Sequence, residues 1–225
     1  MFGLLDNITW HALSGAQARF AAGHGSVRRY AEGFSPVLGF ADQARPDFQA
    51  LESLCHPGEH FYCEGWSGAP PAGWQIEAES TMFKMVYRGA LPPTDEAPDA
   101  LPLGPAHATQ ALELATLTRP GPFGIRTLEL GDYFGYFEGP RLIAMAGERM
   151  QAGSLREISG VCTHPDFQGR GLARRLMNKL LRREMLRGET PFLHVMRDNT
   201  GARALYARMG FVDYREVIVR VICRG

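Results

Sequence analysis

One short segment constrains this chain more than any other: residues 161–173, VCTHPDFQGRGLA. Its first three residues favour the end of a strand, and Pro165 favours a turn. Two glycines, Gly169 and Gly171, then let the backbone approach a ligand closely. A basic amphipathic helix is predicted directly after them, over residues 172–187. Because backbone N–H groups at a helix start have no partner within the helix, the segment predicts a site for an anion such as a pyrophosphate.

Other phosphate-binding patterns fit this chain less well. The pattern Gly-x-x-x-x-Gly-Lys-Ser/Thr of a P-loop occurs nowhere. A dinucleotide-binding turn needs a third glycine and a downstream acidic residue, and both are missing here. Gln168 and Arg174 add side-chain donors, and Ala173 is small where a larger side chain would crowd a phosphate. An ordinary glycine-rich helix start is the alternative, but the strand and turn ahead of the loop favour a binding site.

A second motif follows at residues 199–211, NTGARALYARMGF, over a predicted helix that Gly210 ends. Together the two segments resemble motifs A and B of the GNAT acetyltransferases, in the FR47-like branch. The resemblance implies acetyl-CoA as cosubstrate. It also implies cofactor contacts from the strand end, the loop, the helix start and the start of the second motif: Val161, Cys162, Thr163, Gln168, Gly169, Arg170, Gly171, Leu172, Ala173, Arg174 and Asn199.

The same resemblance assigns a general acid and leaves the proton acceptor open. Tyr206 would protonate the departing CoA thiolate, a role that suits a phenol with a pKa of about 10; a core tyrosine is the alternative. Glu157 is expected to accept the proton of the amine, although a salt-bridged structural glutamate explains it almost as well. Glu148 and His194 are the second and third candidates. Cys162 is interpreted as packing, because no Cys-His-Asp arrangement is visible.

The strand over residues 154–163 carries Gly160 in its interior. A glycine inside a strand indicates a bulge. The resemblance to the GNAT enzymes implies that this bulge separates the strand from the next one and admits the cofactor.

The order of elements in the second part predicts an α+β fold with a mixed central sheet flanked by helices, as in the GNAT acyl-CoA N-acyltransferase fold. Helices are predicted at 109–117, 172–187 and 199–209. Strands are predicted at 132–138, 141–146, 154–163, 191–196 and 211–223.

A proline-rich segment divides the chain, so that we predict a linker at 91–105 between residues 1–90 and a GNAT domain at 106–225. In the first part we predict helices at 14–22, with Ser14 as the N-cap, and at 46–54. Extended chain is predicted at 27–40 and strands at 59–63 and 81–88. This part is expected to be a degenerate GNAT-like half that helps to shape the acceptor pocket.

Composition limits the partners. The 24 basic and 24 acidic residues give a formal net charge of +0, which argues against a nucleic-acid partner. No apolar run approaches the roughly 20 residues of a membrane span, and four cysteines favour the cytoplasm. Cys55, His56, His60 and Cys63 could supply zinc ligands, but the adjacent Cys55-His56 pair lacks the usual spacing, so no metal is expected. A homodimer stays open.

These observations predict an acetyl-CoA-dependent N-acetyltransferase that acts on a small or amino-acid-like primary amine by direct transfer in a ternary complex. A sensor or scaffold that binds CoA without transferring the acetyl group is the alternative. Transfer of a larger acyl group, or transfer to a protein N-terminus, is also open.

Overall fold

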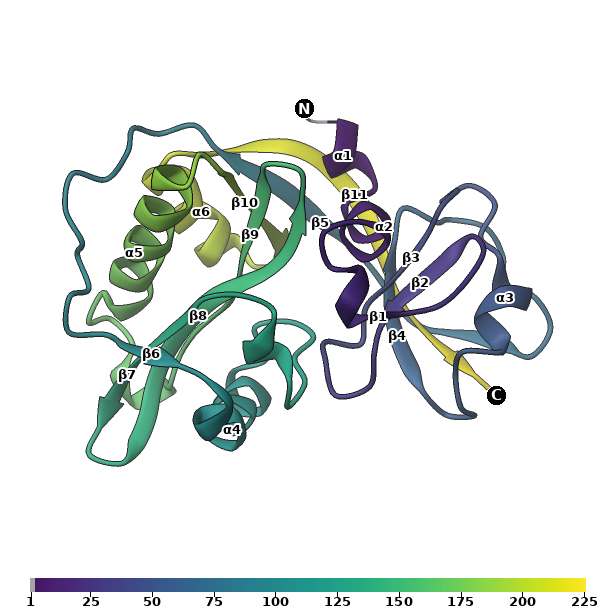
Figure 1. Ribbon diagram of the computed structural model, residues 1–225, viewed down its shortest axis with the longest axis horizontal. Helices are drawn as coiled ribbons and strands as arrows, with labels where there is room; N and C mark the ends of the chain where they lie inside the picture. Colours follow the sequence, from purple (N-terminus) through teal and green to yellow (C-terminus); the bar gives the residue numbers. More distant parts are fainter. Residues whose placement is uncertain (1–2) are drawn as a thin grey trace.

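The computed structural model describes residues 3–225, which form one large and one small sheet with helices around them (Figure 1). The large sheet has eight strands in the order β4-β11-β5-β10-β9-β8-β7-β6. Among the strands of this sheet within residues 3–225, β9 and β10 run parallel and every other neighbouring pair is antiparallel. The predicted mixed sheet flanked by helices is therefore confirmed.

The second part of the chain follows the predicted order. Its strands are β7 (Tyr133–Glu138), β8 (Arg141–Ala152), β9 (Leu155–Thr163), β10 (Thr190–Met196) and β11 (Phe211–Arg224). Its helices are α4 (Ala108–Thr118), α5 (Leu172–Leu186) and α6 (Thr200–Met209). The strand β8 runs six residues past its predicted end, because it continues alongside β9.

The predicted helix at 14–22 is wrong. Helices α1 (Gly3–Asp6) and α2 (Ile8–Ser14) come earlier, and a short 3-10 turn, η1 (Ala18–Phe20), and strand β1 (Ala21–Ala22) follow. Ser14 ends a helix instead of capping one, and its hydroxyl donates to the carbonyl oxygen of Trp10 at 2.6 Å. Apolar side chains of α2, among them Ile8, Ala12 and Leu13, are fully buried. Their helical spacing is the sequence feature that indicates a helix at residues 8–14.

The other elements of the first part lie near their predicted places. Strands β2 (Val27–Tyr30) and β3 (Leu38–Phe40) complete the small sheet with β1. Helix α3 (Phe48–Glu52) begins after Asp47, whose side chain accepts a hydrogen bond from the Ala50 amide at 2.9 Å. Strands β4 (His60–Glu64) and β5 (Trp74–Tyr87) follow, and β5 starts seven residues before its predicted beginning.

Strand β5 lies between β10 and β11, so that the two parts of the chain share one sheet. It pairs with β10 through residues 82–86 and with β11 along nearly its whole length. Figure 1 shows β5 and β11 as long strands that run from the side of α5 and α6 to the side of the small sheet. A cavity beside β5 can therefore take its walls from both parts.

The end of the predicted linker is not a loop, because it forms the short edge strand β6 (Leu101–Leu103) and the start of the 3-10 turn η2 (Pro105–His107). The rest of the proline-rich segment, residues 91–100, is a loop, as predicted, and packs against α5 (Figure 1). Its acidic residues form ion pairs with basic residues of α5, among them Glu96 with Arg174 at 2.6 Å and Asp99 with Arg175 at 2.7 Å. No helix within residues 3–225 is long and apolar enough to cross a membrane.

Candidate active site

Strands β9 and β10 separate after a short parallel stretch. Residues 155–157 of β9 pair with residues 190–192 of β10, and within the described part of the chain their pairing extends no further. On the other side of β9 the register with β8 shifts between Ser159 and Cys162, and Gly160 has a φ of +63°. The bulge predicted at Gly160 is therefore confirmed, and the strands open towards their carboxyl ends.

The ring of Tyr133 lies beneath this bulge. A Cβ at Gly160 would come within 3.2 Å of the ring, and a Cβ at Gly147, on the neighbouring β8, within 2.2 Å. Because no real Cβ can approach an atom that closely, the ring needs a glycine at 147. Tyr133 and its two glycines thus support the bulge that starts the opening.

The strand-end residues divide between the opening and the core. Val161 is half-buried and lines a cavity beside the opening. The thiol of Cys162 packs among apolar side chains next to α4, and burial raises its pKa to about 11. The structure thus agrees with the interpretation of Cys162 as a packing residue.

The glycine loop, residues 168–171, follows β9 after the short 3-10 turn η4 (Pro165–Phe167), at the wide end of the opening. Gly169 and Gly171 have φ of +76° and +74°, and a Cβ at either would meet open space. The loop is exposed, and α5 begins at Leu172 without a side-chain cap, which leaves its first N–H groups available. Arg174, predicted as a donor to the cofactor, lies in the ion pair with Glu96.

Helix α6 places the residues of the second motif at the cavity. Asn199 is its N-cap, and its side-chain oxygen accepts from the Ala202 amide at 3.1 Å. Tyr206 is buried against Phe211, with ring centroids 6.0 Å apart, and it also lines the cavity. Burial raises the pKa of Tyr206 to about 12, so its phenol is protonated at neutral pH.

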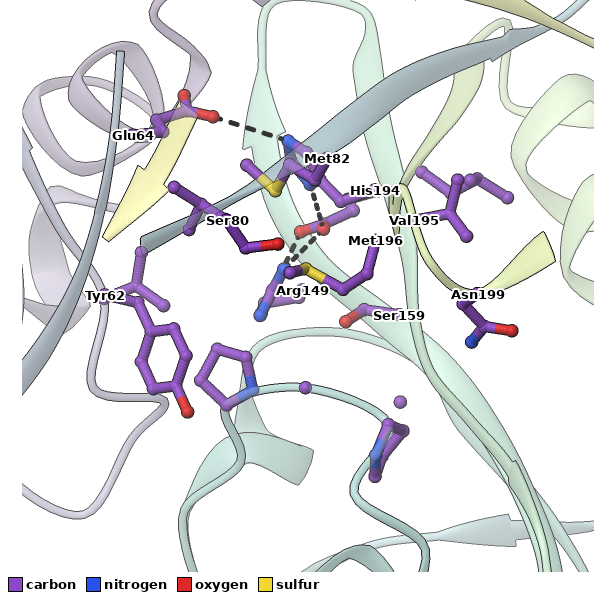
Figure 2. Close-up of a pocket in the computed structure, with 18 of the residues that line it drawn as sticks. Tyr62, Glu64, Ser80, Met82, Arg149, Ser159, His194, Val195, Met196 and Asn199 are labelled. Carbon is purple, nitrogen blue, oxygen red and sulfur yellow. Dashed lines mark hydrogen bonds and ion pairs between the residues drawn. The ribbon is translucent and has the colours of Figure 1, made fainter. Parts of the chain in front are cut away.

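The cavity measures about 470 Å³ and lies between the two parts of the chain. One wall comes from β9, β10 and α6, with Ser159, Val161 and Tyr206 among its residues. The adjoining wall comes from β4, β5 and β11 and includes Val219 and Val221. Tyr62, Glu64, Ser80 and Met82 of this wall are labelled in Figure 2. The glycine loop lies outside this lining.

Glu157 is buried and both of its carboxylate oxygens are occupied. The guanidinium of Arg149 donates to them at 2.9 and 2.6 Å, and Nδ1 of His194 lies 2.7 Å from Oε1. Although burial opposes ionisation, Arg149 and His194 hold the pKa of Glu157 well below its ordinary value. A carboxylate held in this way does not fit the predicted role of proton acceptor.

Of the two other candidates, only His194 faces the cavity. Glu148 is buried behind the sheet, where it pairs with Arg187. His194 uses Nδ1 for Glu157, while its Nε2 has no hydrogen-bond partner within the described chain and lies 3.7 Å from Oε2 of Glu64. Figure 2 shows these contacts running from Glu64 through His194 towards Arg149.

Sequence reasoning missed Arg149 and Glu64. Arg149 lies eight residues before Glu157 on the neighbouring strand, and opposite charges on paired strands were a usable signal for it. For Glu64 there was no such signal, because its place beside His194 depends on the long-range pairing of β5 with β10.

The cysteines and histidines considered for zinc do not converge. Cys55 and Cys63 are buried in the apolar cluster beneath the small sheet, and burial raises the pKa of Cys63 to about 12. The Nδ1 atom of His60 lies 2.5 Å from Oε2 of Glu77 instead. Those two side chains and Cys223 bring three ligand-type atoms within 4.8 Å of one another, on an exposed part of the sheet.

Comparison with known proteins agrees with this geometry. Residues 133–221 match the family of FR47-like proteins. A crystal structure from Novosphingobium aromaticivorans DSM 12444, assigned to the acetyltransferases of the GNAT family, is 31% identical; the match covers 98% of both chains, with a TM-score of 0.88. This chain belongs to the GNAT family. The match extends over both parts of the chain, so the first part is GNAT-like in structure as well.

Two further GNAT relatives show how far the likeness reaches. The N-alpha-acetyltransferase RimI of Mycobacterium tuberculosis (strain ATCC 25618 / H37Rv) is 42% identical over 55 residues, which is 24% of this chain and about a third (34%) of that protein. A GCN5-related N-acetyltransferase-like protein from Streptococcus suis 89/1591 shares the fold, with a TM-score of 0.63 at 14% identity over 97% of this chain and 92% of that one. The predicted family, fold and acetyltransferase activity are thus confirmed.

Proposed function

We propose that this GNAT enzyme transfers the acetyl group of acetyl-CoA directly to the primary amine of a small acceptor. The observation that carries this proposal is the cavity beside the opening between β9 and β10: Val161 and Tyr206 form one wall, and strands from the first part of the chain close the other. Cosubstrate and acceptor would thus meet in one enclosed space, as direct transfer requires.

The residues around the opening fit acetyl-CoA. The edge of β9 beyond Glu157, unpaired with β10, would bind the extended pantetheine arm as an added strand. The pyrophosphate would lie at the start of α5, where Gly169 and Gly171 leave open space and the backbone N–H groups are available. In this arrangement the thioester comes close to Tyr206.

His194 is the proposed proton acceptor, with Glu157 and Arg149 as positioning residues. The Glu157 carboxylate accepts the hydrogen on Nδ1, which leaves the lone pair of the imidazole on Nε2, facing the cavity. Arg149 holds the carboxylate in place through two hydrogen bonds. An acceptor that enters as an ammonium would lose one proton to Nε2 of His194 and become a nucleophile.

The free amine then attacks the carbonyl carbon of the thioester. The C–N bond forms, the C–S bond breaks, and its electron pair goes to sulfur. Tyr206 donates its proton to the thiolate, and the second proton of the amine nitrogen passes to the phenolate oxygen. The products are the acetamide, the CoA thiol and the proton taken up by His194, so that atoms and charges balance.

Release of the CoA thiol from acetyl-CoA, measured over a panel of alkylamines, amino acids and short peptides, tests this proposal. We expect release that depends on a small amine and falls at least 100-fold in His194→Gln, whereas Glu138→Gln, at the exposed end of β7 and outside the cavity lining, keeps its activity within threefold. CoA binding without release for any amine would favour the sensor.

A protein N-terminus is the second candidate acceptor, because the mycobacterial relative carries the name N-alpha-acetyltransferase. Release with peptides alone, and with none of the small amines, would favour that acceptor.

A further inference from the structure

Two buried polar atoms, a carboxylate oxygen of Glu64 and a ring nitrogen of His194, face each other at one end of the cavity. Oε2 of Glu64 and Nε2 of His194 lie 3.7 Å apart, and neither has a hydrogen-bond partner within residues 3–225. Their side chains are only 5% and 10% exposed, so bulk water does not satisfy them freely. Buried polar atoms are nearly always paired, so this end of the cavity needs an occupant that donates hydrogen bonds.

The surroundings of Glu64 keep its second oxygen available. Its Oε1 accepts from Nζ of Lys84 at 2.8 Å, and Lys84 is fully buried. The other two hydrogens of that ammonium are engaged by the carbonyl oxygens of Leu5 and Asp6, at 2.7 and 3.2 Å. Because an ammonium has three hydrogens, Lys84 has none left for Oε2.

The charges around this point also favour a cation. Lys84 and Glu64 form one buried ion pair, and Arg149 and Glu157 form the other, with His194 between them. The cation of each of these two pairs is thus matched by a carboxylate, and in the tautomer of His194 proposed above both Oε2 of Glu64 and Nε2 of His194 are hydrogen-bond acceptors. A carboxylate-bearing group would be repelled by Oε2 of Glu64, whereas an ammonium would bridge Oε2 and Nε2 with two of its hydrogens.

The wall next to Glu64 is largely apolar. Met82, Val219 and Val221 line the cavity on this side, and Figure 2 places Met82 beside His194. Such a wall suits the alkyl body of an amine.

From these contacts we infer that Glu64 is a specificity-determining residue that binds the acceptor as an alkylammonium, with Oε2 of Glu64 and Nε2 of His194 as its two hydrogen-bond acceptors. That the bound amine is the acetyl acceptor rests on the proposed function. The first part of the chain thereby has a role, because β4 supplies Glu64 and β5 supplies Lys84, which holds it. It also explains how the proton reaches His194, since the ammonium is bound in contact with Nε2.

Calorimetric titration with n-butylamine hydrochloride at pH 7, in the presence of saturating CoA, tests this inference without any turnover. n-Butanol serves as the uncharged match. We expect the wild-type protein to bind n-butylammonium at least tenfold more tightly than n-butanol. Glu64→Gln should abolish this preference while the affinity for CoA stays unchanged.

Two further variants make the result decisive. Glu64→Gln leaves Lys84 unpaired, so the double variant Glu64→Gln/Lys84→Met, which removes both charges, is measured alongside and should lose the preference equally. Glu79→Gln alters a different carboxylate of the cavity lining, which is half-exposed and paired with Arg220 at 2.7 Å, and it should keep the preference.

Retention of the preference in either Glu64 variant, with CoA still bound, would overturn the inference, as would its loss in Glu79→Gln. The outcome is separate from the proposed function: a wild-type protein that prefers n-butylammonium yet releases no thiol with any amine would support the ammonium site and contradict the transferase.

Discussion

Replacement of Glu157 by glutamine is expected to destabilise the fold strongly, in addition to its effect on His194. The variant keeps the shape of the side chain but removes the charge that Arg149 faces. Both partners are buried, with side-chain exposures of 8% for Arg149 and 1% for Glu157. Loss of one member of a buried ion pair costs about 3–5 kcal/mol, because the other charge is left uncompensated.

The pH dependence adds a second, quantitative expectation. The pKa of folded Glu157 lies below its ordinary value of 4.5, so the stabilisation from its ionised form is present above about pH 4.5 and is lost as the pH falls towards the folded value. At about 1.4 kcal/mol for each pH unit, the difference between wild type and Glu157→Gln should shrink by about 2 kcal/mol from pH 4.5 to pH 3. The contributions of the other carboxylates to the pH dependence of stability are the same in both proteins and cancel in this difference.

Urea denaturation at pH 7, 4.5 and 3 measures these free energies of unfolding. The double variant Arg149→Met/Glu157→Gln is the control, because it leaves no unpaired charge and should recover most of the lost stability. A decrease in the free energy of unfolding of less than about 1 kcal/mol in Glu157→Gln at pH 7, or a decrease that does not change with pH, would contradict this expectation.

Three other substitutions test separate parts of the structure. Gly147→Ala should lower the free energy of unfolding, measured by urea denaturation, by about 2–3 kcal/mol or more, because its Cβ would lie 2.2 Å from the Tyr133 ring. A decrease of less than about 1 kcal/mol would contradict the conclusion that the Tyr133 ring requires a glycine at 147. Tyr206→Phe should lower kcat about 100-fold with an unchanged Kd for acetyl-CoA, and unchanged turnover would remove it as the acid. Glu184 is fully buried and its pKa is raised by burial, so its stabilising protonated form is lost as the pH rises through that pKa. Glu184→Gln should therefore gain Tm relative to wild type as the pH rises above the ordinary pKa of 4.5, and a pH-independent difference would contradict this.

The sequence was sufficient for the features that depend on local chemistry. The glycine loop, the helix start after it and the bulge at Gly160 follow from residues within one short segment, and the structure has the loop and bulge where they were predicted. The strands and helices of the second part were predicted for the same reason, because each has its own apolar period and its own turn residues.

Features that depend on long-range pairing could not be predicted. That β5 lies between β10 and β11 is decided by contacts across more than 100 residues, and this placement brings Glu64 to His194. Whether Glu157 accepts a proton likewise depends on Arg149. Its guanidinium donates hydrogen bonds to the Glu157 carboxylate only when β8 and β9 are paired. A carboxylate on the right strand was visible in the sequence, but its partners were not.

A crystal structure of the protein with CoA would locate the cosubstrate relative to the opening between β9 and β10. We expect the pantetheine arm against β9 beyond Glu157, the pyrophosphate at Gly169 to Ala173, and the thiol sulfur within about 4 Å of the Tyr206 hydroxyl, a distance at which proton transfer is in reach. CoA bound away from the opening between β9 and β10, or with its sulfur on the far side from Tyr206, would contradict this expectation.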